Sequence, residues 1–156
     1  MFKRILVPLD GSAPARAGLD QAVALARSEG ARLRLMHVVD EHALMQGMEP
    51  AFNVGELLAT LAEEGRKLLA DAAAIARRRG VKADAVLYEL RIGRVADRII
   101  REAKNWRADL IIMGTHGRRG LGRLVMGSDA ESVLRESPVP LLLVKDRGRR
   151  RKARRR

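Results

Sequence analysis

The chain has 156 residues, 47% of them hydrophobic and 3% aromatic, which is enough for one domain with an aliphatic core and excludes global disorder. It contains no cysteine, which excludes disulfides and thiolate metal sites and fits a reducing compartment. Of the net charge of +12, residues 145–156 carry +8 through nine Lys/Arg and one acidic residue, so the remaining chain carries only +4 and a strongly basic domain is excluded.

Apolar runs and helical spacings alternate from one end of the chain to the other. Residues 40–54 show no period and predict a long loop. Strands that alternate with helices form parallel sheets, and runs such as LIIM and LLLV have no polar side to offer water. We therefore predict an α/β fold with a single doubly wound, open parallel sheet of five strands and helices on both faces. The predicted order is strand 2–8, helix 14–28, strand 31–39, helix 55–79, strand 81–90, helix 93–105, strand 108–113, helix 128–137 and strand 139–144.

A glycine-rich segment follows the fourth predicted strand and precedes the last helix. Its spacing is G-x2-G-x9-G-S, formed by Gly114, Gly117, Gly127 and Ser128, and it matches neither the P-loop nor the dinucleotide-binding pattern. Glycines there let the backbone approach a ligand, and a helix N-terminus directs partial positive charge at an anion. The segment can be interpreted functionally, as a loop that binds phosphate with Ser128 as the N-cap of the following helix. It can also be interpreted structurally, as a flexible connection between the strand and the helix.

Several separate segments, in order, resemble the universal stress protein family. They are ILVPLDGS, MHVVD, ADLIIMGTHGRRGLGRLVMGS and SPVPLLLVK, and the resemblance covers roughly residues 2–145. It implies the strand order 3-2-1-4-5, with ATP bound where the order reverses, between strands one and four. The domain would then span residues 1–145, and residues 146–156 would form a disordered basic tail.

The resemblance also implies which residues bind the nucleotide. Asp10 would help hold the adenosine, the backbone of Val38 would meet the adenine edge, and Met113 with Gly114 would flank the ribose. The phosphates would lie against Gly117, Gly127 and Ser128 and carry Mg²⁺ or Mn²⁺, with no protein side chain as metal ligand. The full predicted set is Pro8, Leu9, Asp10, Gly11, Ser12, Val38, Met113, Gly114, Thr115, His116, Gly117, Arg118, Gly127, Ser128 and Asp129.

Some of these residues have a second interpretation. Asp10 could be only the N-cap of the helix that follows it. Asp129 stands where many ATP-binding members have a small or apolar residue, and its carboxylate could repel phosphates or favour the helix N-terminus. His116 has no catalytic triad or metal-ligand spacing around it. Arg118 and its neighbours Arg119 and Arg123 could offset the charge of Asp129.

Three functions remain open from the sequence. The leading hypothesis is an ATP-binding regulatory stress-response protein, because no general base or nucleophile is recognisable beside the glycine loop. A slow ATPase or nucleotidyl-transfer enzyme is the second hypothesis. A nucleic-acid-associated protein acting through the basic tail is the third, although the tail has no aromatic residue for base stacking.

Two further expectations concern the cellular location of the protein and its assembly. The N-terminus lacks the apolar region and cleavage site of a signal peptide, and no stretch approaches the ~20 apolar residues of a membrane span. We therefore expect a cytoplasmic protein that does not enter membranes. The strand at 139–144 would lie at a sheet edge, where Leu141 and Leu143 are poor candidates for exposure, so we expect a homodimer through that strand, as in family members that pair.

Overall fold

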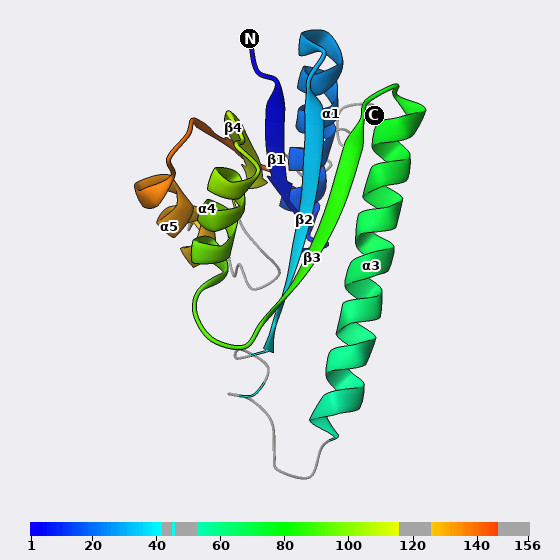
Figure 1. The fold of residues 1–156 in the computed structure, drawn as a ribbon, viewed down its shortest axis with the longest axis vertical. Helices are drawn as coiled ribbons and strands as arrows, with labels where there is room; N and C mark the ends of the chain where they lie inside the picture. Colours follow the sequence, from blue (N-terminus) through cyan, green and yellow to red (C-terminus); the bar gives the residue numbers. More distant parts are fainter. Residues whose placement is uncertain (42–44, 46–52, 116–125, 147–156) are drawn as a thin grey trace, which may run out of the picture.

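Strands and helices alternate along the whole chain in the computed structural model, which describes residues 1–41, 45, 53–115 and 126–146 (Figure 1). None of the described helices is both long and apolar enough to cross a membrane. The elements are β1 (Arg4–Pro8), α1 (Ala13–Glu29), β2 (Arg32–Asp40), α3 (Val54–Arg78), β3 (Ala83–Leu90), α4 (Val95–Asn105), β4 (Leu110–Gly114), α5 (Ser128–Glu136) and β5 (Leu141–Val144).

The strands form one sheet in the order β3-β2-β1-β4-β5, and every neighbouring pair is parallel. This confirms the predicted fold class and strand order. Parallel neighbours need a crossover that passes over a face of the sheet, and the helices between the strands supply it. The order reverses at β1, which pairs with β2 on one side and β4 on the other. In open α/β sheets, ligands bind in a crevice at such a reversal, so the expected crevice lies beyond the carboxyl ends of β1 and β4.

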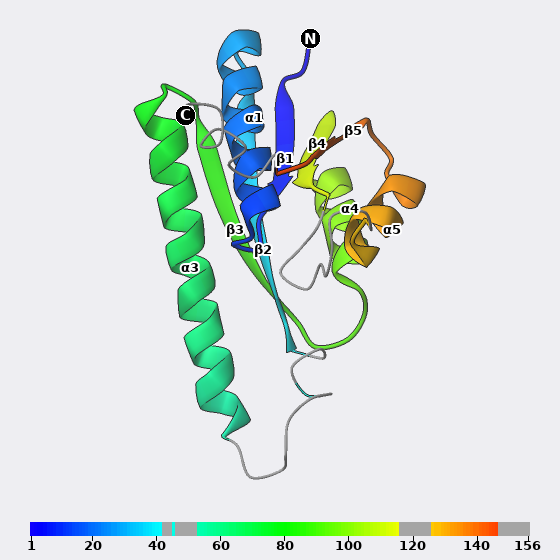
Figure 2. The ribbon, with the colours of Figure 1, turned by 180° about the vertical axis from the view of Figure 1, so that it is seen from behind.

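Helices cover the sheet on both faces, α1 and α3 on one and α4 and α5 on the other (Figures 1 and 2). Successive residues of a strand point to opposite faces, so each inner strand contributes to two apolar clusters. The first cluster lies under α1 and α3 and includes Ile5, Val7, Leu33, Leu35 and Ile112. The second lies under α4 and α5 and includes Leu6, Met36, Ile99, Ile111 and Val133.

Local chemistry sets where the helices begin and end. The Ser12 hydroxyl caps α1 by accepting from the Ala15 amide at 3.2 Å, and Gly30 ends the helix at φ 64°. The predicted start of α4 at Gly93 was two residues early. Gly93 has φ 105°, a conformation that a right-handed helix cannot contain, so α4 begins at Val95.

The last strand is shorter than predicted. It begins at Leu141, because Pro140 has no amide hydrogen to donate to the ladder. Leu141 and Leu143 are half-buried against the second cluster, and the homodimer expected through this strand stays a prediction. Leu142 points the other way and is 41% exposed.

Candidate functional site

The turn after β1 is held by its own side chains and by β2. The Leu9 amide donates to the Met36 carbonyl at 2.7 Å, and His37 Nδ1 donates to the Leu9 carbonyl at 2.7 Å. Asp10 Oδ1 then accepts from the Ser12 amide at 2.9 Å. The helix cap is Ser12, so the interpretation of Asp10 as the N-cap of α1 was wrong. The result is a fixed Asx turn at the crevice.

Gly11 is the point in this turn that requires a glycine. It has φ 82°, a conformation that side chains rarely adopt. A Cβ built there would meet no atom within 4 Å, so the space beside the turn is open on this side. The turn is therefore rigid in its backbone and accessible to a ligand.

The second loop begins where β4 meets the first turn of α1. A Cβ on Gly114 would lie 2.6 Å from the carbonyl carbon of Pro14 and 2.7 Å from the Ala15 nitrogen. Only glycine allows this approach, because backbone atoms cannot move aside. Gly114 thus brings the end of β4 against the helix that follows Ser12, and the two predicted loops meet there.

The glycine loop is closed at its base by backbone hydrogen bonds. Thr115 donates to the Val144 carbonyl at 3.0 Å and accepts from the Gly127 amide at 2.9 Å. Gly127 is the N-cap of α5, so the expectation that Ser128 is the cap was wrong by one position. Ser128 and Asp129 lie exposed in the first turn of α5. His116, Gly117, Arg118, Arg119 and Arg123 lie outside the described residues.

Strand lengths shape the wall of the crevice. β1 ends at Pro8, which pairs with Met36, whereas β2 continues to Asp40. Val38 therefore lies beyond the last pair of β1 and is half-buried beside the second cluster. The N-termini of α1 and α5 reach the same edge, where the positive ends of their helix dipoles favour an anion. Among the described residues, no group of three His, Cys, Asp or Glu side chains could hold a metal ion.

A polar cluster that the sequence did not predict lies on the α4 face of the sheet. Glu102 is buried and accepts from the Tyr88 hydroxyl at 2.5 Å and from Arg34 at 3.2 Å. Burial and the hydrogen bond to Glu102 raise the pKa of Tyr88 above its ordinary value of 10.0. Arg34 lies over the ring of Trp106 and Arg98 over the ring of Tyr88. These partners are far apart in sequence, so no local pattern signals them.

Gly65 is a second residue whose role the sequence analysis missed. It lies in the middle of α3, where glycine costs roughly 1 kcal/mol relative to alanine, and that cost was the available signal of close packing. A Cβ there would lie 2.5 Å from His37 Cδ2 and 2.6 Å from Leu87 Cδ1. The helix therefore lies directly against β2 and β3.

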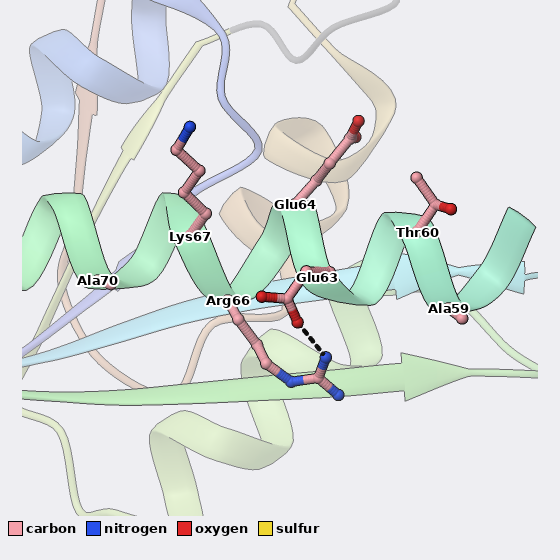
Figure 3. Close-up of a pocket in the computed structure, with 7 residues that line it drawn as sticks. All are labelled: Ala59, Thr60, Glu63, Glu64, Arg66, Lys67 and Ala70. Carbon is pink, nitrogen blue, oxygen red and sulfur yellow. Dashed lines mark hydrogen bonds and ion pairs between the residues drawn. The ribbon is translucent and has the colours of Figure 1, made fainter.

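An open hollow runs along the outer side of the same helix (Figure 3). Its lining residues are Ala59, Thr60, Glu63, Glu64, Arg66, Lys67 and Ala70, none of which is a predicted site residue. Arg66 and Glu63 pair at 2.9 Å, and exposed pairs of this kind contribute little to stability. Because all of its lining residues belong to α3, the hollow is separate from the expected crevice at β1 and β4.

Comparisons with known proteins agree with this fold. The model of the universal stress protein family matches residues 1–145. A universal stress protein of Thermus aquaticus is 39% identical over 146 residues, covering 93% of this chain and all of that protein. The structure of a family member from Burkholderia pseudomallei is 38% identical, with a TM-score of 0.76 over 92% of this chain and 96% of that one.

Another similar solved structure carries a ligand. It is the universal stress protein from Archaeoglobus fulgidus in complex with dAMP, 21% identical, with a TM-score of 0.63 over 93% of this chain and 98% of that one. At this identity the likeness concerns the fold. Together with the match over residues 1–145, these relatives show that the chain belongs to the universal stress protein family.

Proposed function

We propose that this chain is a regulatory stress-response protein that binds ATP in the crevice between β1 and β4. The observation that carries the proposal is the contact at Gly114, where the end of β4 lies against the first turn of α1. This contact brings the Asx turn, two helix N-termini and the base of the glycine loop to one edge of the sheet. Such an edge, at a reversal of strand order, is where open α/β sheets bind ligands.

In this proposal the nucleotide spans the crevice from Val38 to α5. Val38 would meet the adenine through its backbone, and Asp10, held by the Ser12 amide, would face the ribose. The phosphates would lie at Gly127 and the start of α5, where the helix dipole favours negative charge. Pro8, Leu9, Gly11, Met113 and Thr115 would shape the walls.

Divalent metal would enter with the phosphates. No group of three metal-ligating side chains lies at this edge among the described residues, so the phosphate oxygens would be the main ligands of the metal. Mg²⁺ or Mn²⁺ on the triphosphate would also offset the carboxylate of Asp129, which is exposed in the first turn of α5. ATP affinity should therefore fall when EDTA removes the metal, and Asp129→Asn should reduce that dependence.

Thermal melts with and without ATP test the site. A ligand at a hundred times Kd stabilises a fold by roughly 2.7 kcal/mol, which is roughly 5–10 °C for a domain of this size. Gly117→Val should remove the shift, because a branched side chain would fill the space proposed for phosphate. Gly55→Ala, on the exposed start of α3, is the matched control and should keep it. Equal ATP shifts in wild type and Gly117→Val would contradict the site.

Turnover distinguishes a regulatory protein from an enzyme. In the proposal, ATP occupancy rather than hydrolysis is the signal, so purified protein should retain or bind ATP without rapid phosphate release. Ordinary kinases turn over at about 1–100 per second. A steady rate in that range would replace the regulatory proposal with an enzymatic one.

We also propose a homodimer through β5. The strand lies at the sheet edge, and Leu142 on β5 and Leu134 on α5 are 41% and 51% exposed. Unpaired edges with exposed apolar side chains favour pairing with a second chain. Light scattering at tens of micromolar should return twice the chain mass, and Leu142→Lys should return the single mass. A monomer in the wild type would contradict this assembly.

A further inference from the structure

We propose that His37 is the positioning residue of the nucleotide-binding turn, and that its position is set by α3 through Gly65. The inference rests on the proposed function and adds a regulatory contact to it, because it links a helix outside the crevice to nucleotide affinity. Two sets of contacts support it, one on each side of the His37 ring.

The first set lies on the side of the turn. Leu9 is the last residue before Asp10, and both polar groups of its backbone are bound to β2. Its amide continues the ladder of the sheet by donating to Met36. Its carbonyl, by contrast, is held by a side chain, His37 Nδ1 at 2.7 Å. A carbonyl only accepts, so Nδ1 is the donor of this hydrogen bond.

The second set lies on the side of α3. The ring edge of His37 that faces away from Leu9 is against Gly65, where a Cβ would lie 2.5 Å from Cδ2 and 3.1 Å from Nε2. Real Cβ atoms do not approach a ring this closely, so the helix occupies all the room behind the imidazole. His37 thus fills the gap between α3 and the Leu9 carbonyl, with contacts at both ends.

A ring that contacts α3 on one side and binds the Leu9 carbonyl on the other couples the position of the helix to that of the turn. If α3 moves toward the sheet, the ring must turn or shift, and the hydrogen bond to Leu9 lengthens. The peptide after Leu9 belongs to Asp10, whose carboxylate would face the ribose. Coupling between two sites is reciprocal, so nucleotide binding should in turn hold α3 in its observed place.

A purely structural role is the alternative. His37 is half-buried beside the first cluster, and it could matter only as packing volume between α3 and β2. The two roles predict different effects for substitutions of His37. Packing needs volume at Cδ2 and Nε2, whereas positioning needs a donor where Nδ1 stands. Asparagine keeps that donor and removes the rest of the ring, and leucine keeps the volume and removes the donor.

The experiment measures ATP affinity by calorimetry and, without nucleotide, hydrogen exchange at the Ser12 amide. His37→Leu should weaken ATP about tenfold, the effect of one hydrogen bond, while His37→Asn should stay within about threefold of wild type. Gly65→Ala should weaken ATP like His37→Leu, because its Cβ displaces the ring. The double variant Gly65→Ala/His37→Asn should recover affinity, because the shorter side chain makes room and Leu87 Cδ1, which the Cβ would meet at 2.6 Å, is the free end of a flexible side chain that can turn away. Gly55→Ala, in the same helix with only Asn53 Oδ1 at 3.5 Å, is the control and should change nothing.

The two readouts separate this inference from the proposed function. If wild type binds no ATP, the proposed function fails, and the Ser12 amide still tests the contact: exchange should quicken in His37→Leu and Gly65→Ala but not in His37→Asn. If ATP binds and His37→Leu equals wild type in affinity and exchange, His37 is packing only and the inference is overturned. Failure of the double variant to recover would overturn the part played by Gly65.

Discussion

The two faces of the sheet are covered in different ways. Under α1 and α3 the cluster is entirely apolar, and two long helices supply its outer layer (Figure 2). On the opposite face, α4 and α5 gather at the β4 side, and the surface of β2 and β3 carries Arg34 and Tyr88, tied to Glu102 of α4 (Figure 1). Long amphipathic side chains can cover apolar surface while their polar ends bind one another. Both faces are therefore stabilised by apolar packing, and the α4 face adds paired polar groups over β2 and β3.

The largest effect should come from the aliphatic face. Leu35 is fully buried there, so Leu35→Ala should lower the free energy of unfolding by about 2–5 kcal/mol through lost transfer energy and a cavity. Urea unfolding followed by circular dichroism measures it. Ile92→Ala, at a position that is 87% exposed and lies outside the strands and helices, is the control and should change the free energy of unfolding by no more than about 0.5 kcal/mol. Equal losses in the two variants would contradict the importance of the buried face.

The polar face should respond to charge pairing rather than volume. Glu102→Leu keeps the bulk but leaves the Tyr88 hydroxyl and Arg34 without their acceptor, which should cost about 1–3 kcal/mol. Glu102→Gln keeps one acceptor and should cost less. Calorimetric melting of both variants measures the difference. If Glu102→Leu were as stable as wild type, the polar cluster would contribute only packing, and both faces of the sheet would be stabilised in the same way.

Tyr88→Phe should have a smaller effect that depends on pH. It removes one hydrogen bond, about 1 kcal/mol near neutral pH. Because the folded pKa of Tyr88 is raised above 10.0, its contribution is fully present below pH 10 and is lost as pH rises through the folded pKa. The stability gap between wild type and Tyr88→Phe should therefore close in alkaline buffer. A gap that stays constant from pH 8 to pH 12 would contradict the assignment.

Deleting residues 147–156 should have the smallest effect of all. We propose that the domain ends at residue 145 and that the basic tail serves neither face, because its largest apolar side chain is Ala153. The melting temperature should not change. ATP affinity should fall modestly at low salt, because positive charge raises the local nucleotide concentration, and should recover at about 0.5 M salt. Tenfold weaker ATP binding at high salt would mean that tail arginines enter the site.

The fold was predictable because its signal is local. Each strand and helix appears as a period within its own residues, and the apolar runs at 108–113 and 139–144 already require a sheet covered on both faces. Element ends were less certain, since Gly93 and Pro140 shorten their elements by backbone geometry that hydrophobicity does not report.

The site was predictable only in part. The glycine spacing and the Leu9–Ser12 turn were recognised from the sequence and its resemblance, but Gly114 closely approaches the backbone of Pro14 and Ala15, whereas the sequence analysis expected a close approach to a ligand. The contacts of His37 and Glu102 did not follow, because their partners are brought close by sheet register and helix packing. A residue's type limits what it can bind, but the register decides which atom it meets.

The central place of β1 also has a consequence for biosynthesis. β1 leaves the ribosome well before one of its two neighbours, β4, which is completed only at Gly114. At synthesis rates of about 5–20 residues per second, the edge that will receive β4 stays open for about 5–20 s. Ile5, Leu6 and Val7, all fully buried in the finished fold, lie along that edge. The nascent chain should therefore be most exposed to aggregation, and most in need of a chaperone, before β4 is made.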